Sequence, residues 1–256
     1  MHPILLKTPY FTLYTYGLLL ALAYLTALWL LFRNARREGM DPEKISRLGL
    51  WVVIGAIVGA KALMLIHEPP TKFWSLGTLQ SGGDFYGGFI GALLATFLFF
   101  VRNKDVPRWK VADICAPSIA LGQAIGRIGC LMAGCCYGKP ADLPWSITFS
   151  NPAAKELVGT PLGIPLHPVQ LYESLFCLAL FFVLLRQLKK KHFDGQVILL
   201  YALSYAVIRF FLEFVRGDSI RGTVFYGWLS TSQFVALIIL VIGVPLYILK
   251  TKAARK

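Results

Sequence analysis

Seven long apolar stretches constrain this chain more than any other feature of its sequence. A helix needs about 20 apolar residues to cross the hydrocarbon core of a bilayer. The chain is 56% hydrophobic and only 15% charged, whereas a soluble protein carries more charge and lacks repeated apolar runs. The sequence therefore predicts an all-α, polytopic membrane bundle with about seven transmembrane helices. The stretches lie near residues 12–32, 48–66, 85–101, 111–134, 168–186, 196–215 and 231–249.

The net charge of +13 resides in short basic clusters between these stretches, which argues against nucleic acid as a partner. The clusters follow the first, third, fifth and seventh stretches, so all lie on one side of the membrane if the count is seven. Lys and Arg favour the cytoplasmic side. We therefore expect a multi-pass protein of the bacterial cytoplasmic (inner) membrane, with its N-terminus outside and its C-terminus in the cytoplasm. The N-terminus shows no pattern of a cleaved signal peptide.

The connections on the opposite side are rich in Gly and Pro. The longest spans residues 135–167, and we expect it to form a small extracytoplasmic cap or arm. Whether it is helical or extended stays open at this stage. No internal repeat is evident, so residues 1–256 are expected to form a single integral-membrane domain.

Arg127 stands in a run that is otherwise made of apolar and small residues, residues 122–138. An arginine at the centre of a membrane helix costs about 2.5–3.5 kcal/mol to insert, so it is retained where it has a partner. A phosphate is the partner that suits a guanidinium group best. The glycines around it indicate close packing of another helix or of a ligand. A structural role for Arg127 is the less favoured alternative.

A second polar cluster is HPVQLYE, residues 167–173. Pro168 suits the first position of a helix, so Gln170 and Glu173 fall one turn apart on one face. The alternative is a plain helix start whose acid is favoured by the helix dipole.

A third polar cluster is RFFLEFVR, in which Arg209, Glu213 and Arg216 follow i, i+4, i+7 spacing. The predicted topology places all three clusters toward the outer leaflet, where charges inside a membrane protein face a cavity or one another. We expect them to converge around one phosphate head group. An intrahelical ion pair and an Arg216 that snorkels to the interface are the structural alternatives.

Three of the five cysteines, Cys130, Cys135 and Cys136, share one short segment. No second cysteine pair follows, and His167 is the only nearby histidine, so we expect no metal site. Packing of small residues between helices or a local disulfide is the favoured interpretation. A catalytic thiol would lack an adjacent histidine to activate it.

The segment SGGDFYGG, residues 81–88, leads into the third apolar stretch. Its glycines allow either a tight turn with close helix packing or the close approach of a ligand, with Tyr86 at the mouth. Asp84 and Asp113 lie near the ends of predicted helices and are expected to cap helices.

Taken in order, these motifs resemble those of the prolipoprotein diacylglyceryl transferase family over essentially the whole chain. HPVQLYE and the glycine-arginine helix are the most specific parts of the resemblance. The matching segments are TYG at 15–17, SGGDFYGGFIG at 81–91, GRIG at 126–129 with Gly134 and Gly138, HPVQLYE at 167–173, and RFFLEFVRGD at 209–218.

The resemblance implies a transferase that needs no metal or other cofactor. Its partners would be the lipid bilayer, phosphatidylglycerol and prolipoprotein signal peptides. The diacylglyceryl group would pass to the lipobox cysteine as a thioether, and glycerol 1-phosphate would leave. A related membrane transferase with a different acceptor or lipid, or a non-catalytic lipid-binding or transport protein, is the alternative.

The resemblance also implies roles for individual residues. Arg127 and Arg209 correspond to essential arginines of the family, and Glu213 is the partner of Arg209. The expected catalytic residues are Arg209, Glu213, Tyr86 and Tyr16. The expected phosphatidylglycerol-binding residues are Arg127, Arg209, Gly138, Cys130, Cys135, Arg216, His167, Gln170 and Glu173.

Three positions depart from the well-studied members of the family. Tyr86 stands where they have His, Cys130 where they have Asn, and Cys135 where they have Glu. Tyrosine has a reference pKa of about 10, so it is a poor base at neutral pH, and a mechanism with a histidine base does not transfer. We expect instead that the arginines stabilise the leaving phosphate and that Glu213 or water takes the thiol proton.

Overall fold

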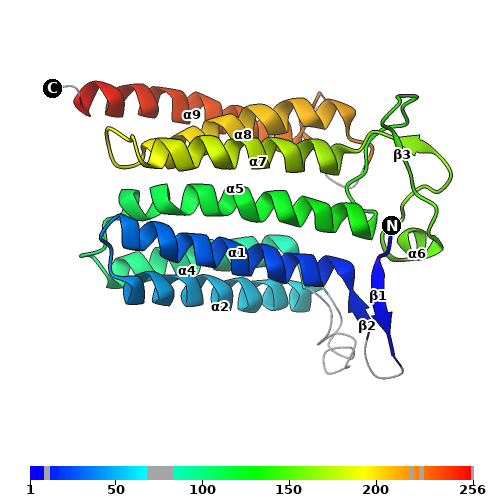
Figure 1. Ribbon diagram of the computed structural model, residues 1–256, viewed down its shortest axis with the longest axis horizontal. Helices are drawn as coiled ribbons and strands as arrows, with labels where there is room; N and C mark the ends of the chain where they lie inside the picture. Colours follow the sequence, from blue (N-terminus) through cyan, green and yellow to red (C-terminus); the bar gives the residue numbers. More distant parts are fainter. Residues whose placement is uncertain (9–11, 68–82, 219–221, 225–227, 255–256) are drawn as a thin grey trace. The chain divides into compact units, whose positions relative to one another are not determined.

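The computed structural model describes residues 1–8, 12–67, 83–218, 222–224 and 228–254, and these are mostly helical (Figure 1). Among these described residues, six helices are long and apolar enough to cross a membrane, and a seventh, over Tyr86–Arg102, is apolar but shorter. The prediction of a polytopic helical membrane protein is therefore confirmed. The long helices are α1 Thr15–Arg37, α2 Pro42–His67, α4 Phe85–Arg102, α5 Arg108–Ala133, α7 Val169–Leu188, α8 Gln196–Val215 and α9 Thr231–Ala254.

The predicted apolar stretches largely coincide with these helices, and the differences lie at the ends. The first helix begins later than predicted because β2 (Thr12–Tyr14) pairs antiparallel with β1 (Ile4–Lys7). At their basic ends α1 and α9 continue past the apolar stretch, since Lys and Arg are good helix formers whose charged heads reach the interface. Parts of two predicted segments, Ser81–Gly82 and Arg255–Lys256, lie outside the described residues.

The chain forms two compact units, one of Met1–Leu31 with Ala112–Lys256 and the other of Phe32–Val111. The unit of Phe32–Val111 is built on the contact of α2 with α4. Glycines line both sides of this contact, and a Cβ atom on Gly91 of α4 would overlap the carbonyl oxygen of Gly55 on α2. Such small residues let two helix backbones approach closely in a membrane, where apolar burial alone drives little association.

The start of α4 carries a side-chain cap. Asp84 accepts a hydrogen bond from the backbone N–H of Gly87 at 3.1 Å, which satisfies one of the four N–H groups left open at a helix start. The predicted capping role of Asp84 is confirmed.

In the other unit, α5, α7, α8 and α9 run side by side, and α8 contacts both α7 and α9 (Figure 1). Ser174 of α7 contacts α5 by donating a hydrogen bond to the Ala124 carbonyl oxygen at 2.8 Å.

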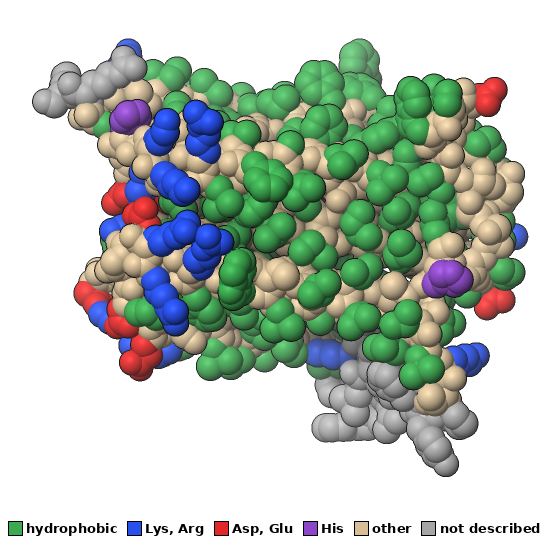
Figure 2. Space-filling view, viewed as in Figure 1, with side chains coloured by type: hydrophobic (Ala, Val, Ile, Leu, Met, Phe, Trp, Pro, Cys, Tyr) green, Lys and Arg blue, Asp and Glu red, His purple; other side chains and the backbone are tan. Residues whose placement is uncertain are grey.

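On the face shown in Figure 2, hydrophobic side chains cover the middle of the helices, while Lys and Arg lie toward helix ends. This distribution is the one expected of helices whose middles contact lipid.

Asp113 of α5 fixes the start of α8. Its carboxylate is fully buried and accepts hydrogen bonds from the backbone N–H groups of Gly195, Val197 and Ile198 at 2.8, 2.9 and 3.0 Å. Lys191 balances the charge at 3.6 Å. Asp113 therefore caps a helix as predicted, but the helix is α8 rather than its own, because the chain turn before α8 packs against α5.

The segment 135–167 contains both helix and strand. A short helix, α6 (Pro152–Val158), begins after the N-cap Asn151. Strands β3 (Ile147–Thr148) and β4 (Pro165–Leu166) flank it and pair antiparallel. Phe149 and Leu166 pack on Leu131 of α5, so the segment has a small core at the end of that helix. A last pair of strands, β5 (Thr223–Val224) and β6 (Leu229–Ser230), precedes α9.

Replacement of Gly91 by Ala should destabilise the unit of α2 and α4 by about 1–3 kcal/mol, because the added methyl overlaps backbone that cannot move alone. The matched control is Gly88→Ala, one turn away on the same helix, where a Cβ would meet only ordinary contacts at 3.4 Å. Thermal unfolding in detergent would measure both. Equal melting temperatures for the two variants would show that the close approach contributes nothing.

Replacement of Asp113 by Asn should lower the free energy of unfolding by about 1–3 kcal/mol, because the amide cannot accept all three backbone hydrogen bonds. The control is Asp194→Asn, which removes a half-exposed carboxylate from the same Lys191 and should change stability by less than about 1 kcal/mol. Urea or thermal unfolding of the purified protein would separate the two. A larger loss in Asp194→Asn would contradict the capping role.

Candidate active site

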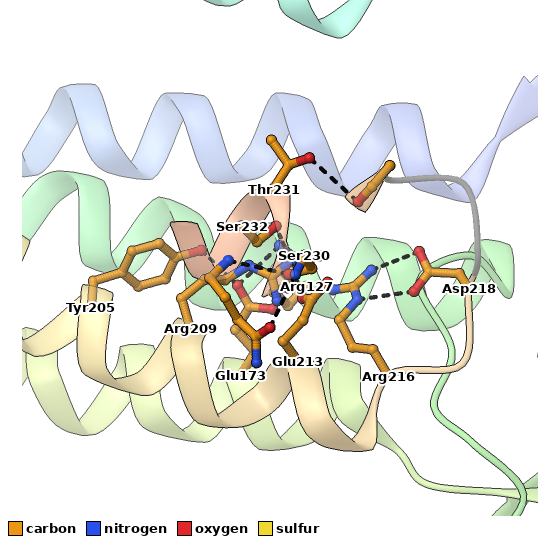
Figure 3. Close-up of polar contacts among 12 residues, drawn as sticks. Arg127, Glu173, Tyr205, Arg209, Glu213, Arg216, Asp218, Ser230, Thr231 and Ser232 are labelled. Atoms are coloured by element: carbon orange, nitrogen blue, oxygen red, sulfur yellow. Dashed lines mark hydrogen bonds and ion pairs between the residues drawn. The ribbon is translucent and has the colours of Figure 1, made fainter. Parts of the chain in front are cut away.

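Glu173 is the centre of a buried polar network that joins three helices. Its side chain on α7 is only 1% exposed. Arg127 of α5 donates from Nη2 to Glu173 Oε1 at 2.9 Å, and the Tyr205 hydroxyl of α8 donates to the same oxygen at 2.8 Å (Figure 3). A buried carboxylate needs such partners because its desolvation costs several kcal/mol. The predicted convergence of Arg127 with the HPVQLYE cluster is therefore present.

A second ion pair lies on α8 next to this network. Arg209 Nη2 contacts Glu213 Oε2 at 2.7 Å, one helical turn away, and donates to the Ser232 hydroxyl of α9 at 3.0 Å. Both guanidinium groups, of Arg127 and Arg209, lie close enough to the Tyr205 hydroxyl to act on it electrostatically. Figure 3 shows the two pairs gathered in one region between the helices.

Arg216 does not lie on the helix face with Arg209 and Glu213, although the i, i+4, i+7 spacing predicts that it should. α8 ends at Val215, and the backbone of Arg216 is extended. Its guanidinium makes two hydrogen bonds to Asp218, Nε to Oδ1 at 2.9 Å and Nη2 to Oδ2 at 2.8 Å. Burial would lower the pKa of Arg216, but the hydrogen bonds to Asp218 raise it above its usual range. The Arg216 guanidinium is therefore paired with Asp218 of its own loop.

A tight backbone crossing at Gly138 explains why the chain leaves the helix here. Gly138 pairs with Arg216 in an isolated bridge, and Gly217 donates to the Tyr137 carbonyl oxygen at 3.1 Å. A Cβ atom on Gly138 would stand 2.5 Å from both Cβ and the carbonyl oxygen of His167. Gly138 and His167 therefore position the end of α8 through their backbones.

The side chains of the HPVQLYE cluster face in different directions. Gln170 is buried and donates from Nε2 to the Cys135 carbonyl oxygen at 2.8 Å. His167 turns toward Tyr172, with 3.5 Å between Nδ1 and the hydroxyl, and Tyr172 accepts from Trp145 Nε1 at 2.7 Å. Gln170 thus supports the turn that follows α5, while His167 belongs to an aromatic cluster beside it.

The three clustered cysteines meet at the end of α5. Their sulfur atoms all lie within 4.8 Å of one another, and all five cysteines of the chain are thiols. Cys136 has a backbone φ of 60°, a left-handed conformation rare outside glycine. Hydrogen bonds with Cys130 and Cys135 lower the pKa of Cys136, and the positive charges of Arg216 and Arg127 lower it further.

The two tyrosines of the predicted catalytic set lie in different units. Tyr16 is in the first turn of α1, with its ring against Gly129 of α5, close enough to Arg127 and Cys130 for electrostatic interaction. Tyr86 is in the first turn of α4, in the unit of Phe32–Val111, and is 63% exposed. The structure therefore brings Tyr16 to the network of Arg127.

Sequence reasoning missed Tyr205, which donates to Glu173, and Ser232, which accepts a hydrogen bond from Arg209. A signal for Tyr205 was present, because Tyr201, Tyr205, Arg209 and Glu213 follow one another at intervals of four and so share one face of α8. Tyr201, on the same face of α8, donates a hydrogen bond to Gln123 of α5 at 2.8 Å. Ser232 gave no such signal, since its contact depends on how α9 packs on α8.

These contacts describe a site that suits an anion with several oxygen atoms. Two guanidinium groups come from different helices, each is oriented by a carboxylate, and the Tyr205 hydroxyl donates to one of these carboxylates. Guanidinium groups bind phosphate through paired hydrogen bonds, and low surrounding polarity strengthens the interaction. The arrangement can therefore bind a phosphate and stabilise negative charge that develops on it.

Comparison with known proteins agrees with this chemistry. Residues 3–249 match the family model described as prolipoprotein diacylglyceryl transferase. Relatives named phosphatidylglycerol–prolipoprotein diacylglyceryl transferase include one from Clostridium tetani, 38% identical over 95% of this chain and 96% of its own length. Another from Thermosynechococcus vestitus is 33% identical over 93% of this chain and 88% of its own length. The chain therefore belongs to the prolipoprotein diacylglyceryl transferase family.

Proposed function

We propose that the protein transfers the diacylglyceryl group of phosphatidylglycerol to the lipobox cysteine of prolipoproteins, the first step in the maturation of bacterial lipoproteins. Family membership supports the reaction. The observation that carries the reaction to particular residues is the pair of guanidinium groups, on α5 and α8, near the half-buried Tyr205 hydroxyl.

The arginines bind the lipid phosphate in this proposal. Arg127 and Arg209 each keep one carboxylate partner, so each is oriented before the lipid arrives. A phosphate bound between the two arginines would accept hydrogen bonds from both guanidinium groups, while Tyr205 keeps Glu173 in place. Because the partners are already in place, little ordering is needed when the head group binds.

The reaction is a substitution at the glyceryl carbon that carries the phosphate. The acceptor thiol loses its proton, and the thiolate attacks that carbon. A C–S bond forms while the C–O bond to phosphate breaks, and the bonding electrons leave with glycerol 1-phosphate. The two arginines stabilise the charge on the leaving group, and Glu213 or water takes the thiol proton.

The proposed orientation places this site toward the outer leaflet of the bacterial cytoplasmic membrane. Arg127, Arg209 and Glu213 lie near the C-terminal ends of α5 and α8, and Glu173 lies near the N-terminal end of α7. The opposite ends of these helices carry basic residues such as Arg108 and Lys191, which favour the cytoplasm. The N-terminus would then be outside, and segment 135–167 would form an extracytoplasmic cap of one integral-membrane domain.

Replacement of Arg127 by Lys should reduce transfer by about 10²–10³-fold, because lysine keeps the charge but loses the planar fork that binds two oxygens. The assay supplies phosphatidylglycerol vesicles and a lipobox peptide and measures release of glycerol 1-phosphate. It also tests the proposed function, since a lipid-binding or transport protein would give no covalent product.

The matched control for this variant is Arg186→Lys, at an exposed position near the end of α7, which should transfer at the wild-type rate. If Arg127→Lys also transfers at that rate, bidentate phosphate binding by Arg127 is wrong. A peptide with Ser in place of Cys should give no product with any variant.

Replacement of Tyr205 by Phe should lower kcat/KM about tenfold, because a hydrogen bond to a charged group contributes about 1.5–3 kcal/mol and here orients Glu173. The control is Tyr201→Phe, one turn away, whose hydroxyl bonds Gln123 outside the ion pairs. The Tyr201→Phe variant should lose about as much stability as Tyr205→Phe but keep kcat/KM within about twofold of wild type. Equal losses of activity in the two variants would assign Tyr205 a structural role only.

A further inference from the structure

Three thiols meet where α5 ends, beside the candidate phosphate site. The sulfur atoms of Cys130, Cys135 and Cys136 all lie within 4.8 Å of one another, and all three residues are thiols. Cys130 lies one helical turn after Arg127, so a movement of its side chain takes place next to a guanidinium group of the site. The cluster is therefore placed to link the chemical state of its thiols to phosphate binding.

Cys136 is the most reactive member of the cluster. It follows the end of α5, is only partly buried, and has a left-handed backbone with a φ of 60°. Hydrogen bonds with the other two thiols lower the pKa of the Cys136 thiol, and the positive charges of Arg216 and Arg127 lower it further. A partly exposed thiolate beside cations is the form of cysteine that attacks disulfides.

Cys130 is a better partner for Cys136 than its neighbour Cys135. The Cα atoms of adjacent residues are about 3.8 Å apart, whereas a disulfide usually joins Cα atoms about 4.4–6.8 Å apart. The Cys135 thiol donates to the Cys130 carbonyl oxygen at 3.7 Å, and the Cys135 carbonyl oxygen accepts from Gln170 at 2.8 Å. A bond between Cys136 and Cys130 avoids the strained ring that a bond between adjacent residues would form.

We propose that Cys130 and Cys136 form a reversible disulfide that lowers lipid transfer, a consequence that rests on the proposed function. The oxidant is a small-molecule disulfide. The Cys136 thiolate attacks one sulfur of the oxidant, and a mixed disulfide forms as the first thiolate leaves. Cys130 then loses its proton and attacks the Cys136 sulfur, and the second thiolate leaves. The two electrons and two protons that the cysteines lose end on the two thiols released from the oxidant.

The proposed orientation puts this cluster on the side of the membrane where disulfides persist. Cys135 and Cys136 begin the segment 135–167, which would form the extracytoplasmic cap. Disulfides form in the oxidising conditions outside the cytoplasm and are rare within it. An oxidant of this class can therefore reach the thiols from the side on which the cap would lie.

The disulfide changes contacts that position the phosphate site. In the reduced protein Cys136 hydrogen-bonds to Arg216, whose backbone pairs with Gly138 where the chain leaves α8. Bonding to Cys130 removes the charge of the Cys136 thiolate and draws its sulfur toward α5. The spacing between the guanidinium groups of α5 and α8 then differs from that of the reduced protein. A misplacement of about 1 Å can slow a reaction by about 100-fold.

Mass mapping of peptides from the full-length protein tests the bond. Treatment with oxidised glutathione in detergent should link Cys130 to Cys136, and dithiothreitol should remove the link. Cys115→Ser, which changes a cysteine of the same helix outside the cluster, should form the same link. Wild-type protein that forms only mixed disulfides with glutathione, a different pairing within the cluster, or no disulfide overturns the proposal. Since wild-type protein decides this point, a variant that fails to fold does not rescue the proposal.

Transfer assays with phosphatidylglycerol vesicles and a lipobox peptide test the effect on activity. After removal of the oxidant, oxidised wild-type protein should release glycerol 1-phosphate at an initial rate at least about tenfold below that of the reduced protein. Dithiothreitol should restore the rate. The ratio of reduced to oxidised rates should fall to about one in Cys136→Ser, whatever the rate of that variant, and should match wild type in Cys115→Ser.

Two results overturn the effect on activity. One is oxidised wild-type protein that carries the link and transfers at the rate of the reduced protein. The other is the same ratio of rates in Cys136→Ser as in wild type. If the link forms but neither the reduced nor the oxidised protein releases glycerol 1-phosphate, the proposed function fails and the disulfide site stands.

Discussion

The buried carboxylate of Glu173 is the interaction on which the rest of the site depends. A charge without water costs several kcal/mol, and removing one partner of a buried pair costs about 3–5 kcal/mol. Glu173 therefore needs both of its partners, Arg127 of α5 and Tyr205 of α8, and holds their side chains at the same carboxylate oxygen. Hydrogen bonds of Ser174 to Ala124 and of Tyr201 to Gln123 join the same three helices. Together with these bonds, the network of Glu173 fixes how the three helices are rotated toward one another, and its arginine is then available to a phosphate.

The helix that carries Tyr205, Arg209 and Glu213 is held at both ends by contacts that are not themselves part of the phosphate site. At its start, Asp113 of α5 accepts three backbone N–H groups. At its end, the crossing at Gly138 draws the chain away from the helix. A helix pinned at two points presents its side chains with little freedom, which is what electrostatic stabilisation of a leaving phosphate requires.

The sequence predicted the parts of this arrangement that follow from periodicity and polarity. Apolar length located the helices, and the spacing of Arg209 and Glu213 predicted their ion pair. What it could not predict depends on packing between helices. Tyr205 meets Glu173 because α7 and α8 are rotated toward one another, and no pattern within either helix fixes that rotation. Arg216 does not share the helix face of Arg209 and Glu213, because α8 ends before it and its backbone pairs with Gly138.

The clustering of the three cysteines is a second feature that the sequence alone could not predict. On the chain, Cys130 and the pair Cys135–Cys136 carry no spacing that indicates a metal site, since a second pair is missing. The left-handed backbone at Cys136 gathers the three sulfurs, and a non-glycine residue in that conformation is rare enough to require a reason.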